Sequence, residues 1–205
     1  LNNPEIDCID ITLRYVSITS LEAIEDTDSI KRDEALKIYE EHCEAYIEFI
    51  EELINYDNSM VNSIKNMRFP YPNIRPGQSE FMKQALNSLC CKEALFALAP
   101  TGTGKTISTL YPAIKGLLKG QYDKIFYLTA KTATRTVACK AINDMRAQGL
   151  IIRSILLQSK EQMCPFHKKC DSKGCKYSEG YYGRVKPALI EILTHDDITP
   201  ELCFS

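Results

Sequence analysis

The stretch that decides the expected fold is residues 99–106, APTGTGKT, which follows an apolar run and precedes a helical pattern. It matches the phosphate-loop signature G-x-x-x-x-G-K-[ST] at each fixed position except the first, where Ala99 stands. Glycines let backbone N–H groups surround an anion, and the start of the following helix adds a positive dipole end. Lys105 is expected to reach the β- and γ-phosphates, and Thr106 to present its hydroxyl to Mg²⁺. The sequence therefore predicts an ATP–Mg²⁺ site formed by Ala99, Pro100, Thr101, Gly102, Thr103, Gly104, Lys105 and Thr106.

The segments around this loop alternate between two apolar periods. Helical periodicity covers residues 78–89, 105–118 and 132–148, and short apolar runs cover 94–99, 124–129 and 151–157. Runs of about six residues between helices of ten or more are typical of parallel strands joined by crossover helices. We therefore predict an α/β fold, a parallel sheet with helices on both faces.

The amino-terminal part has a different pattern. Apolar and polar residues alternate from 9 to 15, which predicts a half-buried strand. Residues 29–66 carry an apolar stripe at three- and four-residue steps, which predicts a long acidic helix, with a possible break at 57–59. The proline-rich stretch 69–78, FPYPNIRPGQ, reads as a linker. We expect an accessory part at 1–68, an ATP-binding part at 69–160 and a cysteine-rich part at 161–205.

Charge is distributed unevenly along the 205 residues. Residues 1–64 hold 16 acidic and 4 basic side chains, whereas residues 65–205 hold 21 basic and 11 acidic ones. The basic part suits a phosphate backbone, and a solvated lysine-rich face is the alternative. The nine cysteines are an odd number without a signal peptide, so metal binding or burial is expected rather than a disulfide framework. No apolar run approaches the ~20 residues of a membrane span, and the start at Leu1 suggests a fragment.

Three motifs in order resemble those of superfamily 2 helicases. The loop A-x-T-G-x-G-K-T resembles motif I, and NIRPGQSEFM is similar to the adenine-reading Q-motif region, which implies nucleotide contacts for Arg75 and Gln78. Residues 126–138, FYLTAKTATRTVA, resemble motif Ia. That likeness implies contacts to a single-strand backbone from Thr129, Lys131, Thr132 and Arg135. The resemblance implies a RecA-like motor core.

The stretch 163–180, MCPFHKKCDSKGCKYSEG, follows the third predicted strand. A cysteine-rich insertion at this place is similar to the XPD/DinG-type DNA helicases, which carry a [4Fe–4S] domain. The resemblance implies that Cys164, Cys170 and Cys175 are cluster ligands, with a fourth at Cys203 or beyond Ser205. Two alternatives stay open: a Zn²⁺ site that also uses His167, or free cysteines in a lysine-rich loop. Three tyrosines are expected either to stack on bases or to pack around the cluster: Tyr177, Tyr181 and Tyr182.

The function implied by the resemblance is ATP hydrolysis coupled to translocation on single-stranded DNA and to duplex unwinding, in repair or replication. A cytoplasmic, nucleoid-associated protein without a membrane role is expected. No D-E-x-H box occurs in the sequence, and Asp33–Glu34 precede the phosphate loop on the acidic helix. We therefore expect this chain alone to bind ATP weakly at most and not to hydrolyse it. The alternative is a nucleic-acid-binding ATPase module that holds a structural zinc ion and does not unwind DNA.

Overall fold

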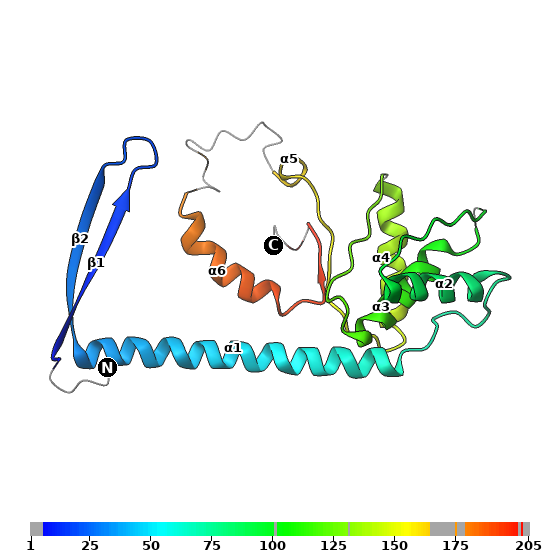
Figure 1. Cartoon of the computed structure of the whole chain (residues 1–205), viewed down its shortest axis with the longest axis horizontal. Helices are drawn as coiled ribbons and strands as arrows, with labels where there is room; N and C mark the ends of the chain where they lie inside the picture. Colours follow the sequence, from blue (N-terminus) through cyan, green and yellow to red (C-terminus); the bar gives the residue numbers. More distant parts are fainter. Residues whose placement is uncertain are drawn as a thin grey trace. The chain divides into compact units, whose positions relative to one another are not determined.

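The computed structural model describes residues 6–100, 102–130, 132–164, 175, 179–200 and 202. Of residues 132, 133, 160 and 186 it describes the backbone alone. The chain divides into two compact units, Leu1–Asn58 and Ser59–Ser205. Figure 1 labels their elements, and each unit is described by itself.

The first unit contains an antiparallel hairpin. Strand β1 (Cys8–Val16) pairs with β2 (Ala23–Lys31), and Ile9 lies opposite Ile30. The predicted first strand is confirmed, but its partner was missed because the sequence of β2, AIEDTDSIK, is mostly polar. Residues 29–31, which were expected to be helical, therefore belong to β2. No described residue between 6 and 58 is buried, so the predicted half-burial of the first strand is not found along most of its length.

The long helix α1 spans Arg32–Asn66 and is continuous through the possible break at 57–59. Asp33 and Glu34 lie in its first turn and Lys65 in its last. These charges interact favourably with the helix dipole at both ends and stabilise the helix. The boundary between the units falls inside this helix, after Asn58. Its last turns belong to the second unit, where Ile64 is fully buried.

The second unit is mostly helical over its described residues. The three predicted helices are confirmed as α2 (Gln78–Cys91), α3 (Lys105–Gly116) and α4 (Thr132–Arg146). Helix α3 lies between the other two in contact with both, and a 3₁₀ turn, η1 (Leu117–Lys119), continues it. Two further helices follow, α5 (Lys160–Met163) and α6 (Tyr181–Ile192).

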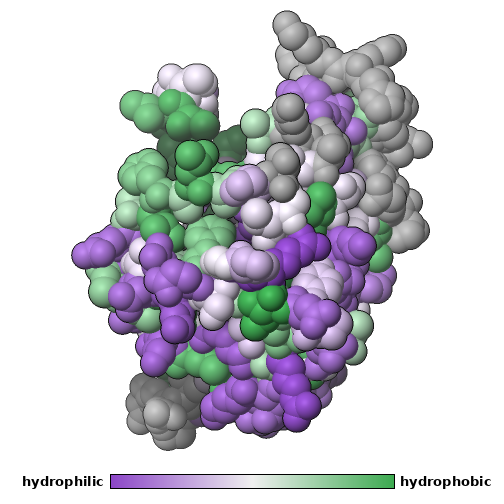
Figure 2. Space-filling view, turned by 90° about the vertical axis from the view of Figure 1, so that its right-hand side faces the viewer, coloured by the Kyte–Doolittle hydropathy of each residue, from purple (hydrophilic) through white to green (hydrophobic). Residues whose placement is uncertain are grey.

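The predicted parallel sheet is wrong for the described residues. Only two short sheets form there: the β1–β2 hairpin, and a parallel pair of β3 (Ser154–Ile155) and β4 (Asp197–Ile198). Residues 94–99 and 124–129 form no strands, and Phe96, Leu98 and Leu128 are 95%, 103% and 88% exposed. Figure 2 shows hydrophobic side chains at the surface among hydrophilic ones. The RecA-like fold class predicted from the sequence is thus contradicted. A strand needs hydrogen bonds to a neighbouring strand, and an apolar pattern within one segment does not show whether such a neighbour exists.

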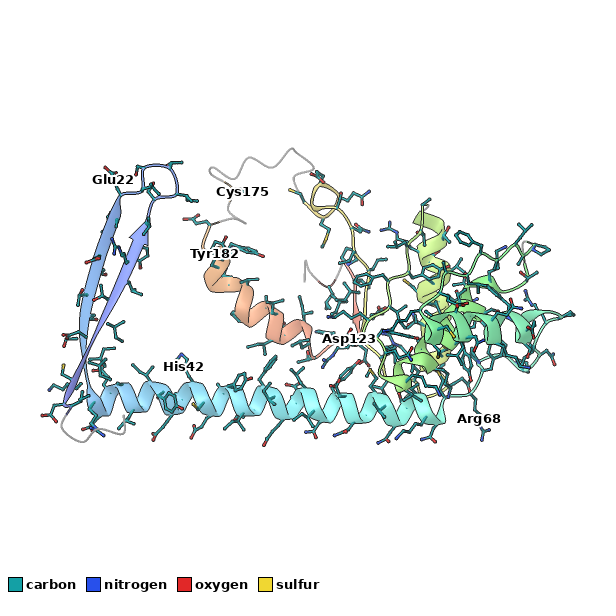
Figure 3. All side chains as sticks on the ribbon, in the orientation of Figure 1. Glu22, His42, Arg68, Asp123, Cys175 and Tyr182 are labelled. Carbon is teal, nitrogen blue, oxygen red and sulfur yellow. The ribbon has the colours of Figure 1, made fainter. Side chains whose placement is uncertain are left out.

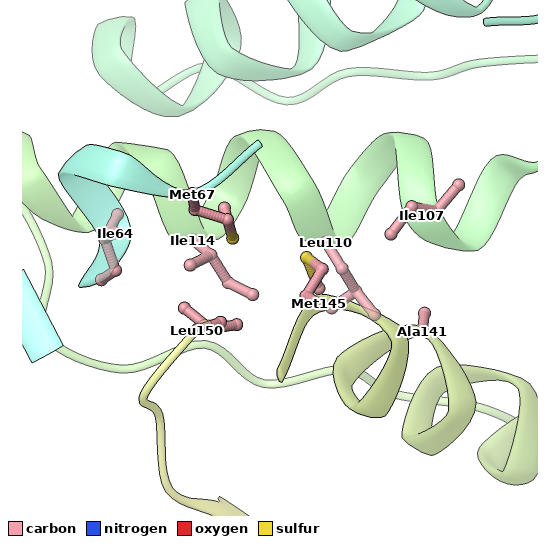
Figure 4. Close-up of a cluster of buried hydrophobic side chains, with 8 residues drawn as sticks. All are labelled: Ile64, Met67, Ile107, Leu110, Ile114, Ala141, Met145 and Leu150. Atoms are coloured by element: carbon pink, nitrogen blue, oxygen red, sulfur yellow. The ribbon is translucent and has the colours of Figure 1, made fainter. Parts of the chain in front are cut away.

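The hydrophobic core lies where the end of α1, helix α3 and helix α4 meet (Figure 4). Ile114 and Met145 are at most 1% exposed in its centre. The other buried members are Ile64, Met67, Ile107, Leu110, Ala141 and Leu150. Because Ile107 follows the phosphate loop by one residue, this core fixes the start of α3 and with it the end of the loop.

Side chains of α3 also contact the last turn of α1 and the segment that follows it. The Nζ of Lys115 donates hydrogen bonds to the carbonyl oxygens of Ile64 and Lys65, at 2.6 and 3.2 Å. The ring of Phe69 packs edge-on against Tyr111, at 5.4 Å between centroids. Desolvation lowers the pKa of Lys115. The start of the proline-rich stretch 69–78 is therefore packed against α3 within the second unit. None of the described helices is both long and apolar enough to cross a membrane.

Candidate nucleotide-binding loop and cysteine-rich segment

The phosphate-loop residues lie between a segment without regular secondary structure and the first turn of α3. Gly102 and Gly104 have φ angles of 84° and 79°, in the left-handed region that favours glycine. Gly104 is the N-cap of α3, so Lys105 and Thr106 are the first two residues of the helix. Thr101, also predicted here, lies outside the described residues. Both glycines thus have backbone angles that residues with a side chain rarely adopt, while their role in holding an anion stays a prediction.

Lys105 turns its side chain back over the loop. Its Nζ donates to the carbonyl oxygens of Ala99 and Pro100, at 2.8 and 2.9 Å. The hydroxyl of Thr103 donates to the same Pro100 oxygen, at 2.9 Å. The ammonium group therefore lies beside the loop carbonyls, where a bound anion would compete with them for its protons.

Two residues lie against this loop: Gln78, the first residue of α2, and Arg75, three residues before it. The Nη1 of Arg75 donates to the carbonyl oxygen of Gly102, and the backbone N–H of Arg75 donates to Gln78 Oε1 at 3.0 Å. Gln78 is 5% exposed, and its Nε2 lies 2.7 Å from where a Cβ on Gly104 would stand. The structure thus brings both residues to the phosphate loop. Adenine recognition by Gln78 stays a prediction, since its amide oxygen accepts a backbone proton here.

Thr106 has a partner that the sequence reading did not identify. The hydroxyl of Tyr127 donates to Thr106 Oγ1 at 3.3 Å. Tyr127 lies in segment 124–129, which was predicted as a strand, two residues after Ile125, which packs against the core. Side chains two residues apart in an extended segment point to the same side. That spacing is the signal that could have placed Tyr127 beside α3.

The residues present suit an ATP–Mg²⁺ ligand. Gly102 and Gly104 carry no Cβ, and a Cβ at Gly104 would meet Gln78. An ammonium group and a helix start favour phosphate, and a hydroxyl oxygen is a ligand type that Mg²⁺ accepts. Lys105 and Arg75 would hold the phosphates and Thr106 the metal. When bound, the ion would neutralise phosphate charge.

The predicted DNA-contact residues fall at the start of α4. Thr129 lies at the end of the segment that carries Tyr127, and Arg135 donates from Nη1 to the carbonyl oxygen of Leu157 at 3.5 Å. Lys131 lies outside the described residues, as does the side chain of Thr132. Arg135 is thus tied to residues 152–157, the segment that leads into the cysteine-rich stretch.

Two of the three predicted cluster cysteines are described. Cys164 and Cys175 are half-buried, while Cys170, Cys203 and His167 lie outside the described residues. Among the residues that can be placed, no group of three or more His, Cys, Asp or Glu side chains forms a metal site. The metal-site prediction therefore depends on residues that the structure does not describe.

The tyrosines that follow the cysteines lie at the start of α6. The rings of Tyr181 and Tyr182 meet edge-on at 5.4 Å between centroids. Tyr182 is 88% exposed (Figure 3). Its ring offers a face for stacking, although base stacking stays a prediction; Tyr177 lies outside the described residues.

Arg146, in the last turn of α4, holds the two ends of the cysteine-rich segment together. Its Nη2 donates to the carbonyl oxygens of Ile152 and Asp196, at 2.8 and 2.6 Å, and to Ser154 Oγ at 3.0 Å. Ser154 donates to Asp197 Oδ1 at 2.6 Å. Since β3 and β4 pair at the same place, the stretch between them begins and ends at one point within the second unit. This network was not predicted from the sequence.

Comparisons with protein-family models, with curated proteins and with solved structures find no match to this chain.

Proposed function

We propose that this chain binds ATP with Mg²⁺ through residues 99–106 and belongs to an ATP-dependent DNA helicase that acts on single-stranded DNA. In that function, Lys105 and Thr106 serve the nucleotide phosphates and the metal, with Arg75 and Gln78 beside them. Thr129, Lys131, Thr132 and Arg135 would contact the DNA backbone.

The observation that supports this proposal most strongly is the backbone of the phosphate loop. Gly102 and Gly104 both have positive φ, and Lys105 begins α3 directly after them. This combination brings the N–H groups of a helix start and an ammonium group to one small region. A glycine turn that only capped an ordinary helix would not need a lysine folded back over its carbonyls.

ATP turnover and strand separation test the helicase part of the proposal. In the protein that carries this chain in the cell, Lys105→Ala should abolish DNA-stimulated ATP hydrolysis and unwinding of a duplex with a single-stranded tail. Lys124→Ala is a matched control, because Lys124 lies in an exposed ion pair with Asp123. Normal hydrolysis in the Lys105 variant would contradict the proposal.

The cysteine-rich segment is proposed to hold a [4Fe–4S] cluster with Cys164, Cys170 and Cys175 among its ligands. Anaerobic purification followed by iron, sulfide and zinc analysis measures the metal directly. Iron and sulfide in equal amounts, lost in Cys170→Ser but kept in Cys139→Ser, would support the cluster. One zinc ion per chain without iron would instead favour the binding module with a structural zinc site.

A further inference from the structure

We infer that Tyr127 is a positioning residue for Mg²⁺ at the proposed nucleotide site, because its hydroxyl is placed to hold the hydroxyl of Thr106. This inference rests on the proposed ATP–Mg²⁺ site and adds a residue that none of the recognised motifs assigns. The two residues concerned are Thr106, at the end of the phosphate loop, and Tyr127, which contacts it.

The packing and exposure of residues 125–128 show how Tyr127 lies relative to α3. Ile125 packs against the core that contains Ile107, and Tyr127, two residues later, contacts Thr106 in the first turn of α3. The intervening Phe126 and the following Leu128 are 74% and 88% exposed, whereas Tyr127 is 37% exposed. The alternation shows that the segment turns one side toward α3. A tyrosine on that side is long enough to bring its hydroxyl to the first turn of α3.

The hydroxyl contact has a chemical consequence for Thr106. The two oxygens lie 3.3 Å apart, with Tyr127 as donor. A hydroxyl has one proton and two lone pairs, so the pair can exchange donor and acceptor roles. An oxygen that faces a cation must turn its proton elsewhere, and the Tyr127 oxygen is a ready acceptor. Partners that orient metal ligands in this way commonly contribute about 10- to 100-fold in metal affinity or activity.

The test measures how much Mg²⁺ tightens ATP binding. The dissociation constant for ATP is determined by calorimetry on the full 205-residue chain, once in EDTA and once in excess MgCl₂, and the ratio of the two is the magnesium gain. Tyr127→Phe should reduce this gain by about 3- to 10-fold, less than the usual about 10- to 100-fold, because the pair is partly exposed. Its ATP affinity in EDTA should stay that of the wild type.

Two further variants separate positioning from general packing. Tyr122→Phe is the matched control, because Tyr122 also packs beside α3 but donates to the Ala113 carbonyl at 2.6 Å, away from Thr106. It should keep the full magnesium gain. In a Thr106→Ala background, Tyr127→Phe should change the gain no further, since it acts through Thr106.

Each other outcome overturns the inference. An unchanged gain in Tyr127→Phe, an equal loss of affinity with and without Mg²⁺, or a further loss in the Thr106→Ala background would remove Tyr127 from this role while leaving the ATP site intact. No ATP binding by the wild type in either buffer would overturn the proposed site itself, and the inference with it.

Discussion

The Nη2 atom of Arg146 donates a hydrogen bond of 2.6 Å to the carbonyl oxygen of Asp196, which joins the end of α4 to a residue on the far side of the cysteine-rich segment. The Arg146 side chain is only 16% exposed, and Nη1 also lies 3.7 Å from Asp197 Oδ1. Its Nε is buried without a partner among the described residues. One planar guanidinium group therefore serves both the exit and the return of the segment.

Arg146→Lys should lower the free energy of unfolding by about 1–3 kcal/mol, because an ammonium group cannot reproduce the spread of donors of a guanidinium. Urea unfolding measures the change. Arg14→Lys is the control: Arg14 pairs with Glu25 at 3.5 Å in an exposed position, and the change should stay within about 0.5 kcal/mol. Equal effects of the two substitutions would contradict the role given to Arg146.

The contact between Tyr71 and Asp144 predicts a pH dependence. Tyr71 donates to Asp144 Oδ2 at 2.6 Å, and this hydrogen bond, followed by desolvation and the charge of Asp144, raises the pKa of Tyr71 above 10.0. A raised folded-state pKa stabilises the protein fully below the unfolded value, and that contribution is lost as the pH rises through the folded one. Tyr71→Phe should therefore be less stable than the wild type at pH 8, with a difference that shrinks above pH 10. Urea unfolding at both pH values measures this, and a constant difference would argue against the assignment.

Gly104 has a close neighbour at the position of an added Cβ. The other glycines with positive φ have open space there. Gly104→Ala would place a Cβ 2.7 Å from Gln78 Nε2, and moving that amide costs its hydrogen bond from Arg75. Gly120→Ala has a similar φ, +65°, but no heavy atom within 4 Å of the added Cβ. Both variants should lose about 1–2 kcal/mol from backbone strain, and Gly104→Ala about 1 kcal/mol more. Equal losses in thermal unfolding would show that Gln78 does not pack against the loop.

Three helices of the second unit could be predicted from the sequence, but helices α5 and α6 and the sheets of the structure could not. Helices α2, α3 and α4 begin at the predicted residues because each helix closes its hydrogen bonds within itself, and Gly77 and Gly104 mark the starts of the first two. A strand depends on a partner that local sequence does not name. Residues 94–99 and 124–129 have apolar runs without any ladder, while the polar β2 pairs along its whole length.

The corrected fold predicts which apolar side chains contribute to stability. Leu98→Ala should change the free energy of unfolding by less than about 0.5 kcal/mol, because Leu98 is fully exposed. Ile114→Ala should cost about 2–5 kcal/mol, because Ile114 is 1% exposed in the core. A loss at Leu98 as large as that at Ile114 would mean that residues 94–99 are buried as the sequence pattern first indicated.

The candidate site was predicted in part. Motif spacing identified the loop, Arg75 and Gln78, and the structure brings these together. Tyr127 and Arg146 were missed, because their partners Thr106 and Asp196 lie 21 and 50 residues away in the chain. Contacts at such separations follow from packing rather than from a local pattern.

The central claim, that residues 99–106 bind ATP, is tested most directly by calorimetric titration of ATP with MgCl₂ into the 205-residue chain and its Lys105→Ala variant. We predict saturable binding of one ATP per wild-type chain. The Lys105→Ala variant should bind at least about 10-fold more weakly, while Lys124→Ala binds like the wild type. No binding by the wild type, or equal binding by the Lys105 variant, would contradict the account.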